Sequence, residues 1–276
     1  MTLSERNTFF KAGIAFCSAC TLLILAASFF AIPVYPEIEE SVSRPANAFQ
    51  IVTGYFLAHN YFAVHASLAI SILFSLVGIL FIHSFFERTS APEILYIAIF
   101  TISFAFESLR LVLPLHLIYD FPSFYVRIAF RILFFARFFC IFSLFAASIC
   151  AAGLEIQKTR NVIFVITVAS LVITTGVPID VLNWDTSLNT INGYVAMFRL
   201  IEMLAFLTTL TSFLIAAKNR GSKEYIYVAV GIFIALIGRN ILLSADNWTG
   251  PFIGALLLSF GTWFLCVKLH KIHLWL

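Results

Sequence analysis

Eight charged side chains lie inside stretches of this sequence that are otherwise apolar. Glu107 and Arg110 are three residues apart, and so are Arg199 and Glu202. Residues three or four positions apart are neighbours on one face of a helix. The other four are all arginines, namely Arg127, Arg131, Arg137 and Arg239. Because arginine presents a rigid fork of N–H donors that fits carboxylate and phosphate, this set predicts recognition of an anion.

The composition around these charges is typical of a membrane protein. Of the 276 residues, 61% are hydrophobic and 11% are charged, whereas soluble domains are about 25% charged. Apolar runs long enough to cross a bilayer as helices recur eight times, at 12–33, 59–83, 95–114, 124–150, 161–178, 192–217, 225–244 and 251–268. We therefore expect an all-α integral membrane bundle of eight transmembrane helices that contacts the lipid bilayer. The longest connection, 34–58, leaves no room for a soluble catalytic or DNA-binding domain.

The charges in the loops predict the orientation of the bundle. Loops on one side carry ten basic residues, whereas loops on the other side carry one arginine, Arg44, and seven acids. Lys and Arg are retained on the cytoplasmic side, so both termini are expected in the cytoplasm and the protein in the plasma (inner) membrane. The net charge of +3 then reflects orientation and gives no reason to expect nucleic acid as a partner.

This orientation also places the intramembrane charges in depth. Nearly all of them fall in the outer half of their spans, and only Arg137 approaches the midplane. His59, Asn60 and His65 begin the second span at the same outer level, and Asn240 ends the seventh span there. A charged side chain at the bilayer centre costs about 2.5–3.5 kcal/mol, so these groups are expected to face one another or water. We therefore predict a polar cavity that opens to the outside.

The predicted cavity carries more positive than negative charge. Six arginines against two glutamates leave an excess of about four, and unpaired buried charge is costly. An anionic small molecule or a lipid headgroup is the predicted partner. The expected ligand-binding residues are Arg110, Arg131, Arg199 and Arg239 as anion contacts, Glu107 and Glu202 as orienting counter-charges, His65 as a hydrogen-bonding neighbour, and Asn60, Arg127 and Asn240 beside them. The alternative is structural, because arginines near span ends can reach the interface or bond to helix carbonyls.

The order of landmarks along the chain suggests an internal repeat. Arg110 and Arg239 each lie twelve residues before a proline, across the turn between two spans. Together with similar span ends, this favours two tandem four-helix halves, 1–155 and 156–276, within a single transmembrane domain, with 34–58 as an extracytoplasmic insertion. Parallel repeats of this kind occur in transporters, so transport of an organic anion or lipid is an alternative function.

Motifs for other chemistry are missing from the sequence. It contains no H-E-x-x-H, no G-x-S-x-G and no glycine-rich phosphate loop. His65 and His83 lie on the same predicted span, which His59 begins, and no histidine lies on another span, which argues against haem. We expect no metal and no cofactor, and the sequence does not favour an enzyme. An intramembrane transferase that uses Glu107 or His65, and a structural subunit of an envelope complex, stay open as further alternatives.

One segment resembles a known family of membrane sensors. The stretch "NYFAVHASLAISI" at 60–72 is similar to the start of the second span in multi-span membrane-associated sensor domains of bacterial histidine kinases and diguanylate cyclases. That family has Asn-Tyr, three residues, His and then Glu. Asn60, Tyr61 and His65 match this pattern, whereas Ala69 occupies the position of the glutamate.

The resemblance extends over 58–150. The family carries an acid and a histidine three residues apart on its third span, and Glu107 and Arg110 keep the spacing but change the second residue. The next span has Ile-Ala-x-Arg, which is similar to "IAFR" at 128–131. The resemblance implies a helical sensor that reads a ligand through the outer polar site. Because no output domain follows the last span, it implies a separate cytoplasmic signalling partner.

Overall fold

The computed structural model describes residues 3–31, 56, 58–86, 91–153 and 159–274. Within these ranges, eight helices are long and apolar enough to cross a membrane, which confirms the predicted multi-pass helical bundle. Seven spans are single helices, namely α1 (Leu3–Ala31), α4 (Tyr61–Phe86), α7 (Ser123–Ala152), α8 (Thr159–Gly176), α9 (Val195–Arg220), α10 (Glu224–Leu243) and α11 (Thr249–Leu274). The third span consists of α5 (Pro92–Ser103), the 3₁₀ helix η2 (Phe104–Leu111) and α6 (Val112–Tyr119). The predicted loop 34–58 lies almost entirely outside the described residues.

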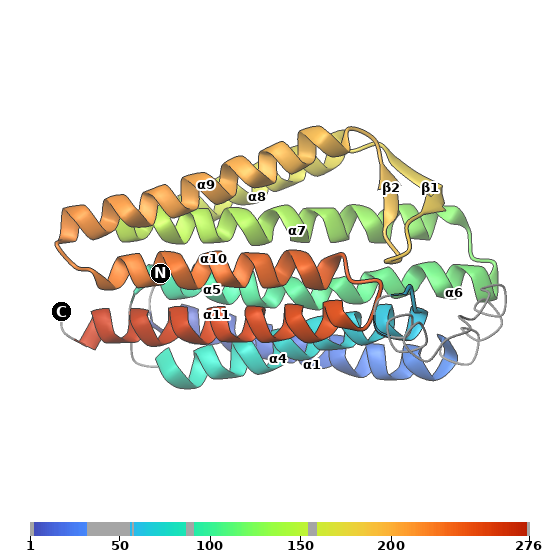
Figure 1. Ribbon diagram of the computed structural model, residues 1–276, viewed down its shortest axis with the longest axis horizontal. Helices are drawn as coiled ribbons and strands as arrows, with labels where there is room; N and C mark the ends of the chain where they lie inside the picture. Colours follow the sequence, from blue (N-terminus) through green and yellow to red (C-terminus); the bar gives the residue numbers. More distant parts are fainter. Residues whose placement is uncertain (1–2, 32–55, 57, 87–90, 154–158, 275–276) are drawn as a thin grey trace.

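The helices run side by side along the long axis of the molecule (Figure 1). We call the end at which α1 begins and α11 ends the terminus end, and the opposite end the hairpin end. The predicted cytoplasmic location of the terminus end and the predicted tandem halves stay predictions.

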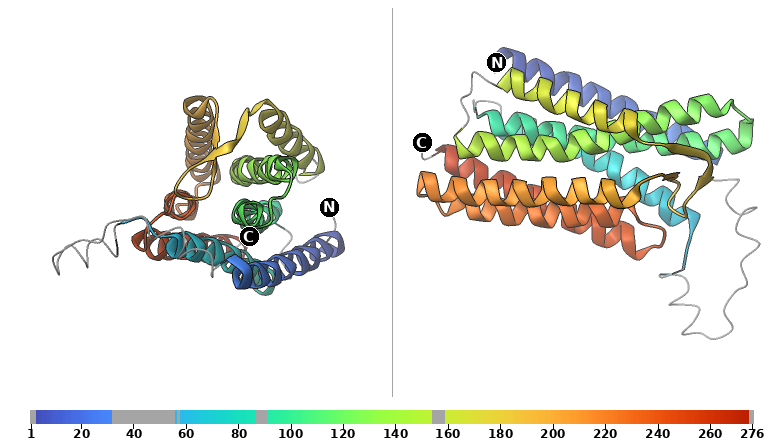
Figure 2. Two further views of the ribbon diagram at one scale, coloured as in Figure 1. Left: turned by 90° about the vertical axis from the view of Figure 1, so that its right-hand side faces the viewer. Right: turned by 90° about the horizontal axis from the view of Figure 1, so that it is seen from above.

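The third span forms the centre of the bundle. Of the residues in its most apolar stretch, 83% are buried, against 22% in the spans formed by α1, α8 and α9. Seen end-on, α7 lies between α5 on one side and the α8 and α9 pair on the other (Figure 2). Glu107 and Arg110 on the third span and Arg137 on α7 are therefore enclosed by protein, whereas α8 and α9 expose most of their surface.

The third span is wound tightly where it carries its charges. In a 3₁₀ helix, side chains three residues apart are aligned, so Phe104, Glu107 and Arg110 share one face, and all three are buried. Eight residues is long for such a helix. Pro114 contributes to the winding, because proline cannot donate to the carbonyl of Arg110, four residues earlier, and its ring clashes with that carbonyl. The sequence pattern predicted the shared face but not the 3₁₀ winding.

Close packing between α10 and α11 fixes the direction of Arg239. A Cβ atom at the neighbouring Gly238 would lie 2.9 Å from the carbonyl oxygen of Gly254 on α11, so this side of α10 tolerates no side chain. Arg239, one residue further along α10, points instead toward α7 and α9, where its guanidinium reaches the carbonyl of Arg137.

A β-hairpin connects α8 and α9 at the hairpin end, where the sequence predicted only a loop. Strands β1 (Ile179–Trp184) and β2 (Thr190–Asn192) are antiparallel, with Trp184 opposite Thr190. The side chain of Asp185 accepts hydrogen bonds from the backbone N–H groups of Ser187, at 3.0 Å, and Asn189, at 2.8 Å. Such bonds from an aspartate to the following backbone stabilise tight turns.

The tip of the hairpin is docked into the end of the bundle. Leu188 is 3% exposed and belongs to an apolar cluster that includes Val64 and Phe130. Its φ of 58° is unusual for a residue with a side chain and is stabilised here by this burial. Ser187 also donates a hydrogen bond of 3.3 Å to the carbonyl of Ser244, at the end of α10. The hairpin therefore contacts α4, α7 and the end of α10.

Candidate functional site

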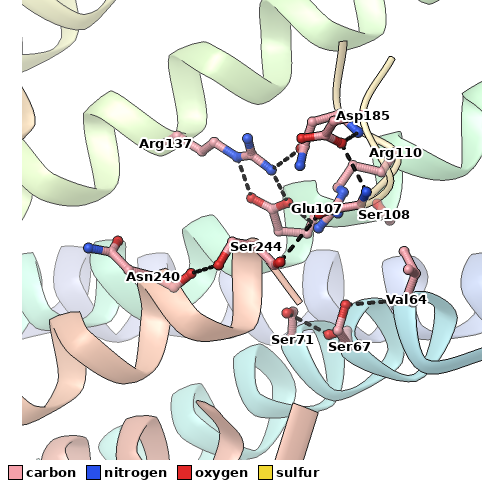
Figure 3. A network of polar contacts seen from close by, with 12 residues as sticks. Val64, Ser67, Ser71, Glu107, Ser108, Arg110, Arg137, Asp185, Asn240 and Ser244 are labelled. Carbon is pink, nitrogen blue, oxygen red and sulfur yellow. Dashed lines mark hydrogen bonds and ion pairs between the residues drawn. The ribbon is translucent and has the colours of Figure 1, made fainter. Parts of the chain in front are cut away.

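A buried carboxylate, Glu107, forms the centre of the charged site (Figure 3). Arg137 on α7 binds it with both arms of its fork, Nε to Oε1 at 2.8 Å and Nη2 to Oε2 at 2.7 Å. Glu107 is 2% exposed, so the pair is shielded from solvent. Bidentate pairs of this kind are among the strongest polar contacts in proteins and fix the geometry of both partners.

The second arginine beside Glu107 is poorly paired. Arg110 is fully buried, and its Nη1 lies 3.6 Å from Oε2 of Glu107, beyond hydrogen-bonding distance. Its Nε and Nη2 atoms have no hydrogen-bond partner among the described residues. A buried donor without a partner costs about 1–3 kcal/mol, so this side chain is retained at a cost in stability.

Arg137 links Glu107 to the hairpin and to α10. Its Nη2 donates to Oδ1 of Asn189, in the turn just before β2, at 2.8 Å, and its carbonyl accepts a 3.4 Å hydrogen bond from Arg239. Sequence reasoning did not include Arg137 or Asn189 among the site residues. The available signal for Arg137 was its depth, as the arginine nearest the predicted midplane, whereas no signal pointed to Asn189.

The second glutamate pairs with Arg239. Glu202 on α9 lies 3.8 Å from Nη2 of Arg239, and its side chain is 34% exposed. Arg239 also donates to the side chain of Asn240 at 2.9 Å. Arg239 and Glu202, expected to lie near each other, are therefore in contact, and Asn240 supports the arginine.

A cavity of about 160 Å³ lies beside this network, between α7, α9 and the end of α8. Its lining consists of Phe134, Arg137, Phe138, Val177, Val195, Phe198, Arg199 and Glu202. Arg199 is exposed and makes no hydrogen bond or ion pair with any other residue in the described part of the chain. The cavity therefore combines two guanidiniums, one of them with free donors, and one carboxylate with walls made of aromatic and aliphatic side chains.

Of the predicted arginines, only Arg199 lines this cavity. Arg110 and Arg239 belong to the ion-pair network beside it, and Arg131 and Arg127 lie elsewhere. Arg131 donates to the carbonyls of Thr174 and Thr175, at 3.3 and 3.2 Å, near the end of α8. A cation is favourable there because the C-terminus of a helix carries partial negative charge. Arg127 is exposed in the first turns of α7, with no hydrogen bond or ion pair to the described residues. Arg131 therefore matches the structural alternative, in which an arginine bonds to helix carbonyls, and Arg127 lies exposed near the end of its span.

The predicted polar residues of α4 also lie elsewhere. His65 shares a 2.6 Å hydrogen bond with Ser28, at the contact between α4 and α1. Asn60 caps α4, since its Oδ1 accepts from the backbone N–H groups of Phe62 and Ala63. Neither residue lines the cavity. Both therefore organise the helix ends around the site rather than the cavity itself.

The charge balance of the site differs from the expected one. Four guanidiniums, on Arg110, Arg137, Arg199 and Arg239, share two glutamates, and Asp185 of the hairpin lies close enough to Arg110 for electrostatic attraction (Figure 3). The excess is about one positive charge rather than about four. Within the described ranges, no group of three or more His, Cys, Asp and Glu side chains is arranged to hold a metal ion.

Comparison with known proteins adds no relative to this description. No protein-family model matches the chain, and no curated protein is significantly similar to it in sequence. The resemblance of 58–150 to membrane sensor domains therefore stays a prediction.

Proposed function

We propose that this protein is a receptor-like integral membrane protein that binds a small amphipathic anion in the cavity between α7 and α9. The observation that carries the proposal is that Arg199, which has free donors, and Arg137 line the same cavity, whose walls include three phenylalanines. Guanidinium forks favour carboxylate or phosphate oxygens, and the walls favour an apolar body. A ligand with both parts satisfies both surfaces.

The cavity limits the size of the enclosed part of the ligand. A volume of about 160 Å³ is similar to the roughly 150 Å³ that holds one benzene molecule in an engineered protein cavity. A carboxylate or phosphate group with one ring or a short chain therefore fits. A longer acyl chain would extend beyond the cavity, along the exposed apolar surface of α9, where Leu200 and Met203 are 58% and 62% exposed.

Sensing is favoured over transport by the position of the site. The ion pairs around Glu107 and Glu202 and the cavity itself all lie toward the hairpin end, on η2, α7, α9 and α10. A receptor needs only this one site and an element that responds to it. A transporter also needs a route for the anion past the buried residues of α5 and α7 to the terminus end.

The binding proposal is tested by calorimetric titration of the purified protein in nanodiscs of zwitterionic lipid. The probes are octanoate, benzoate and inorganic phosphate, with octanol and octyltrimethylammonium as neutral and cationic controls. We expect saturable binding of octanoate or benzoate and none of the controls. Equal binding of octanol and octanoate would show that the guanidiniums contribute nothing, and the proposal would be wrong.

Replacing Arg199 by glutamine is expected to weaken binding of octanoate about tenfold. The reason is that a hydrogen bond to a charged group contributes about 1.5–3 kcal/mol, and 1.4 kcal/mol is a factor of ten. Arg127→Gln is the matched control, because Arg127 is also exposed and does not line the cavity. An equal loss in both variants would indicate unspecific attraction of anions to the surface.

Transport is the second candidate, and flux separates it from sensing. Proteoliposomes with labelled octanoate on one side are expected to leak no faster than protein-free liposomes. Flux that depends on Arg199 would identify a transporter that uses the same site. A structural subunit would show neither specific binding nor flux.

A further inference from the structure

We infer that Glu107 changes its arginine partner when the cavity is filled: an anion at Arg137 displaces Glu107 toward Arg110, and Arg137 then releases the hairpin. This inference rests on the proposed function, because it describes how that site passes on the presence of its ligand. Two observations support it. Glu107 binds Arg137 closely and Arg110 only weakly, and Arg137 both lines the cavity and binds Asn189 of the hairpin.

The first step is competition for Arg137. This guanidinium lines the cavity, and at the same time its Nε and Nη2 bind Glu107 while Nη2 also binds Asn189. A second anion on the cavity side would lie within a few ångströms of the Glu107 carboxylate. Two like charges that close repel strongly in a site shielded from water. Binding therefore weakens the contact between Arg137 and Glu107.

The second step needs a new partner for Glu107, and Arg110 is placed to supply one. Its Nη1 is already 3.6 Å from the carboxylate, and its Nε and Nη2 have no partner among the described residues. A side-chain rotation of Glu107 toward Arg110 would give this guanidinium the hydrogen bonds to a carboxylate that it lacks. The energetic cost of burying Arg110 without a full partner in the ligand-free state is explained if Arg110 pairs with Glu107 in the ligand-bound state.

The third step is the release of the hairpin tip. Asn189 loses its contact with Arg137 when the fork of Arg137 turns to the bound anion. The hairpin loop also binds the connection between α10 and α11, through a 3.2 Å hydrogen bond from Thr186 to Asp246. The carbonyl of Asp246 accepts a 2.9 Å hydrogen bond from the backbone of Asn60, which caps α4. A shift of the hairpin would therefore change contacts at the start of α4 and at the connection between α10 and α11.

A double-mutant cycle tests the exchange without any ligand. Arg110→Met should leave the melting temperature unchanged or raise it, because Arg137 still holds Glu107. Arg137→Met should lower it only slightly, because Arg110 takes the carboxylate. The double variant leaves Glu107 without a guanidinium, and its melting temperature should fall by at least about 6 °C more than the sum of the single changes. Adding Glu107→Gln should restore it.

The control pair is Arg127→Met with Arg137→Met, which should be additive because Arg127 lies outside the network. The double variant Arg110→Met, Arg137→Met could fail to fold while both single variants fold. If Glu107→Gln then restores folding, the result is also non-additive and supports the inference. Additive effects in the Arg110 and Arg137 pair, or a single Arg137→Met variant as unstable as the double, would show that Arg110 cannot accept Glu107. Either outcome overturns the inference.

Hydrogen exchange of the hairpin amides tests the link to the ligand. Saturating octanoate should speed exchange severalfold in peptides covering 184–192 of the wild-type protein. In Arg110→Met, octanoate should bind about tenfold more weakly and leave hairpin exchange unchanged. Unaltered binding and the same increase in exchange in that variant would refute the exchange mechanism. If octanoate, benzoate and phosphate all fail to bind, the proposed function fails. The double-mutant cycle without ligand still tests whether Glu107 can change its arginine partner.

Discussion

Replacing Glu107 by alanine is expected to lower the free energy of unfolding by about 3–5 kcal/mol. Among the residues that the structure describes, the substitution removes the only carboxylate in ion-pair contact with both Arg110 and Arg137, which are enclosed by protein. Buried charges without partners cost far more than exposed ones. Equilibrium unfolding in mixed micelles of dodecyl maltoside and sodium dodecyl sulfate measures this change directly.

The matched control for that variant is Glu202→Ala. Glu202 is also an intramembrane carboxylate that contacts an arginine, but its side chain is 34% exposed and its contact is longer, at 3.8 Å. Arg239 is buried but keeps its hydrogen bonds to Asn240 and to the carbonyl of Arg137, so this variant should lose much less than Glu107→Ala, about 1 kcal/mol. Adding Arg110→Met to Glu107→Ala should recover more than half of the loss. Equal losses for the two glutamates would contradict the central place of Glu107.

Replacing both Arg137 and Arg199 by glutamine is expected to weaken octanoate binding by at least about 100-fold. Each guanidinium contributes a charge-assisted contact, and the cavity contains no other cation among its lining residues. The fold should survive, because Arg110 stays available to Glu107. Titration calorimetry of the variant in nanodiscs measures the loss.

The corresponding control removes the same number of charges from the same region. The variant Arg127→Gln, Arg131→Gln changes two arginines of α7 that do not line the cavity. Its affinity for octanoate should stay within about twofold of the wild type, since Arg127 is exposed and screened by salt, and the donors of Arg131 are directed to the carbonyls at the end of α8. A large loss in this control would place the anion elsewhere on α7.

The positions of the spans were predictable because the bilayer sets their length. A run of about 20 apolar residues has few other uses, and the predicted span 124–150 corresponds to Ser123–Ala152 in the structure. The shared face of Glu107 and Arg110 was predictable in the same way, from helical spacing alone. These features depend on local sequence, so the sequence is sufficient to find them.

Other features depend on contacts between distant segments. The bond between Arg137 and Glu107 joins residues 30 positions apart, and the rotation of α7 that permits it comes from packing on both of its sides. Arg131 had the same spacing signal as the site arginines, but it faces the end of α8. Residue type and predicted depth cannot distinguish these two directions.

The hairpin was missed for a different reason. Strand β2 is three residues long, which is too short for an alternating pattern to appear in the sequence. Asn189 follows a turn, where polar residues are common, so nothing marked it as a partner of Arg137. The link between the cavity and the hairpin is visible only in three dimensions.

The central claim is that an anion binds between α7 and α9, and photolabelling tests its location most directly. A medium-chain carboxylate with a diazirine on its chain is bound to the protein in nanodiscs and activated by light, and the labelled peptides are identified by mass spectrometry. We expect labelling within 134–138 or 195–203 that octanoate suppresses, that octanol does not, and that Arg199→Gln reduces. Labelling confined to other helices, or unaffected by octanoate and by Arg199→Gln, would contradict it.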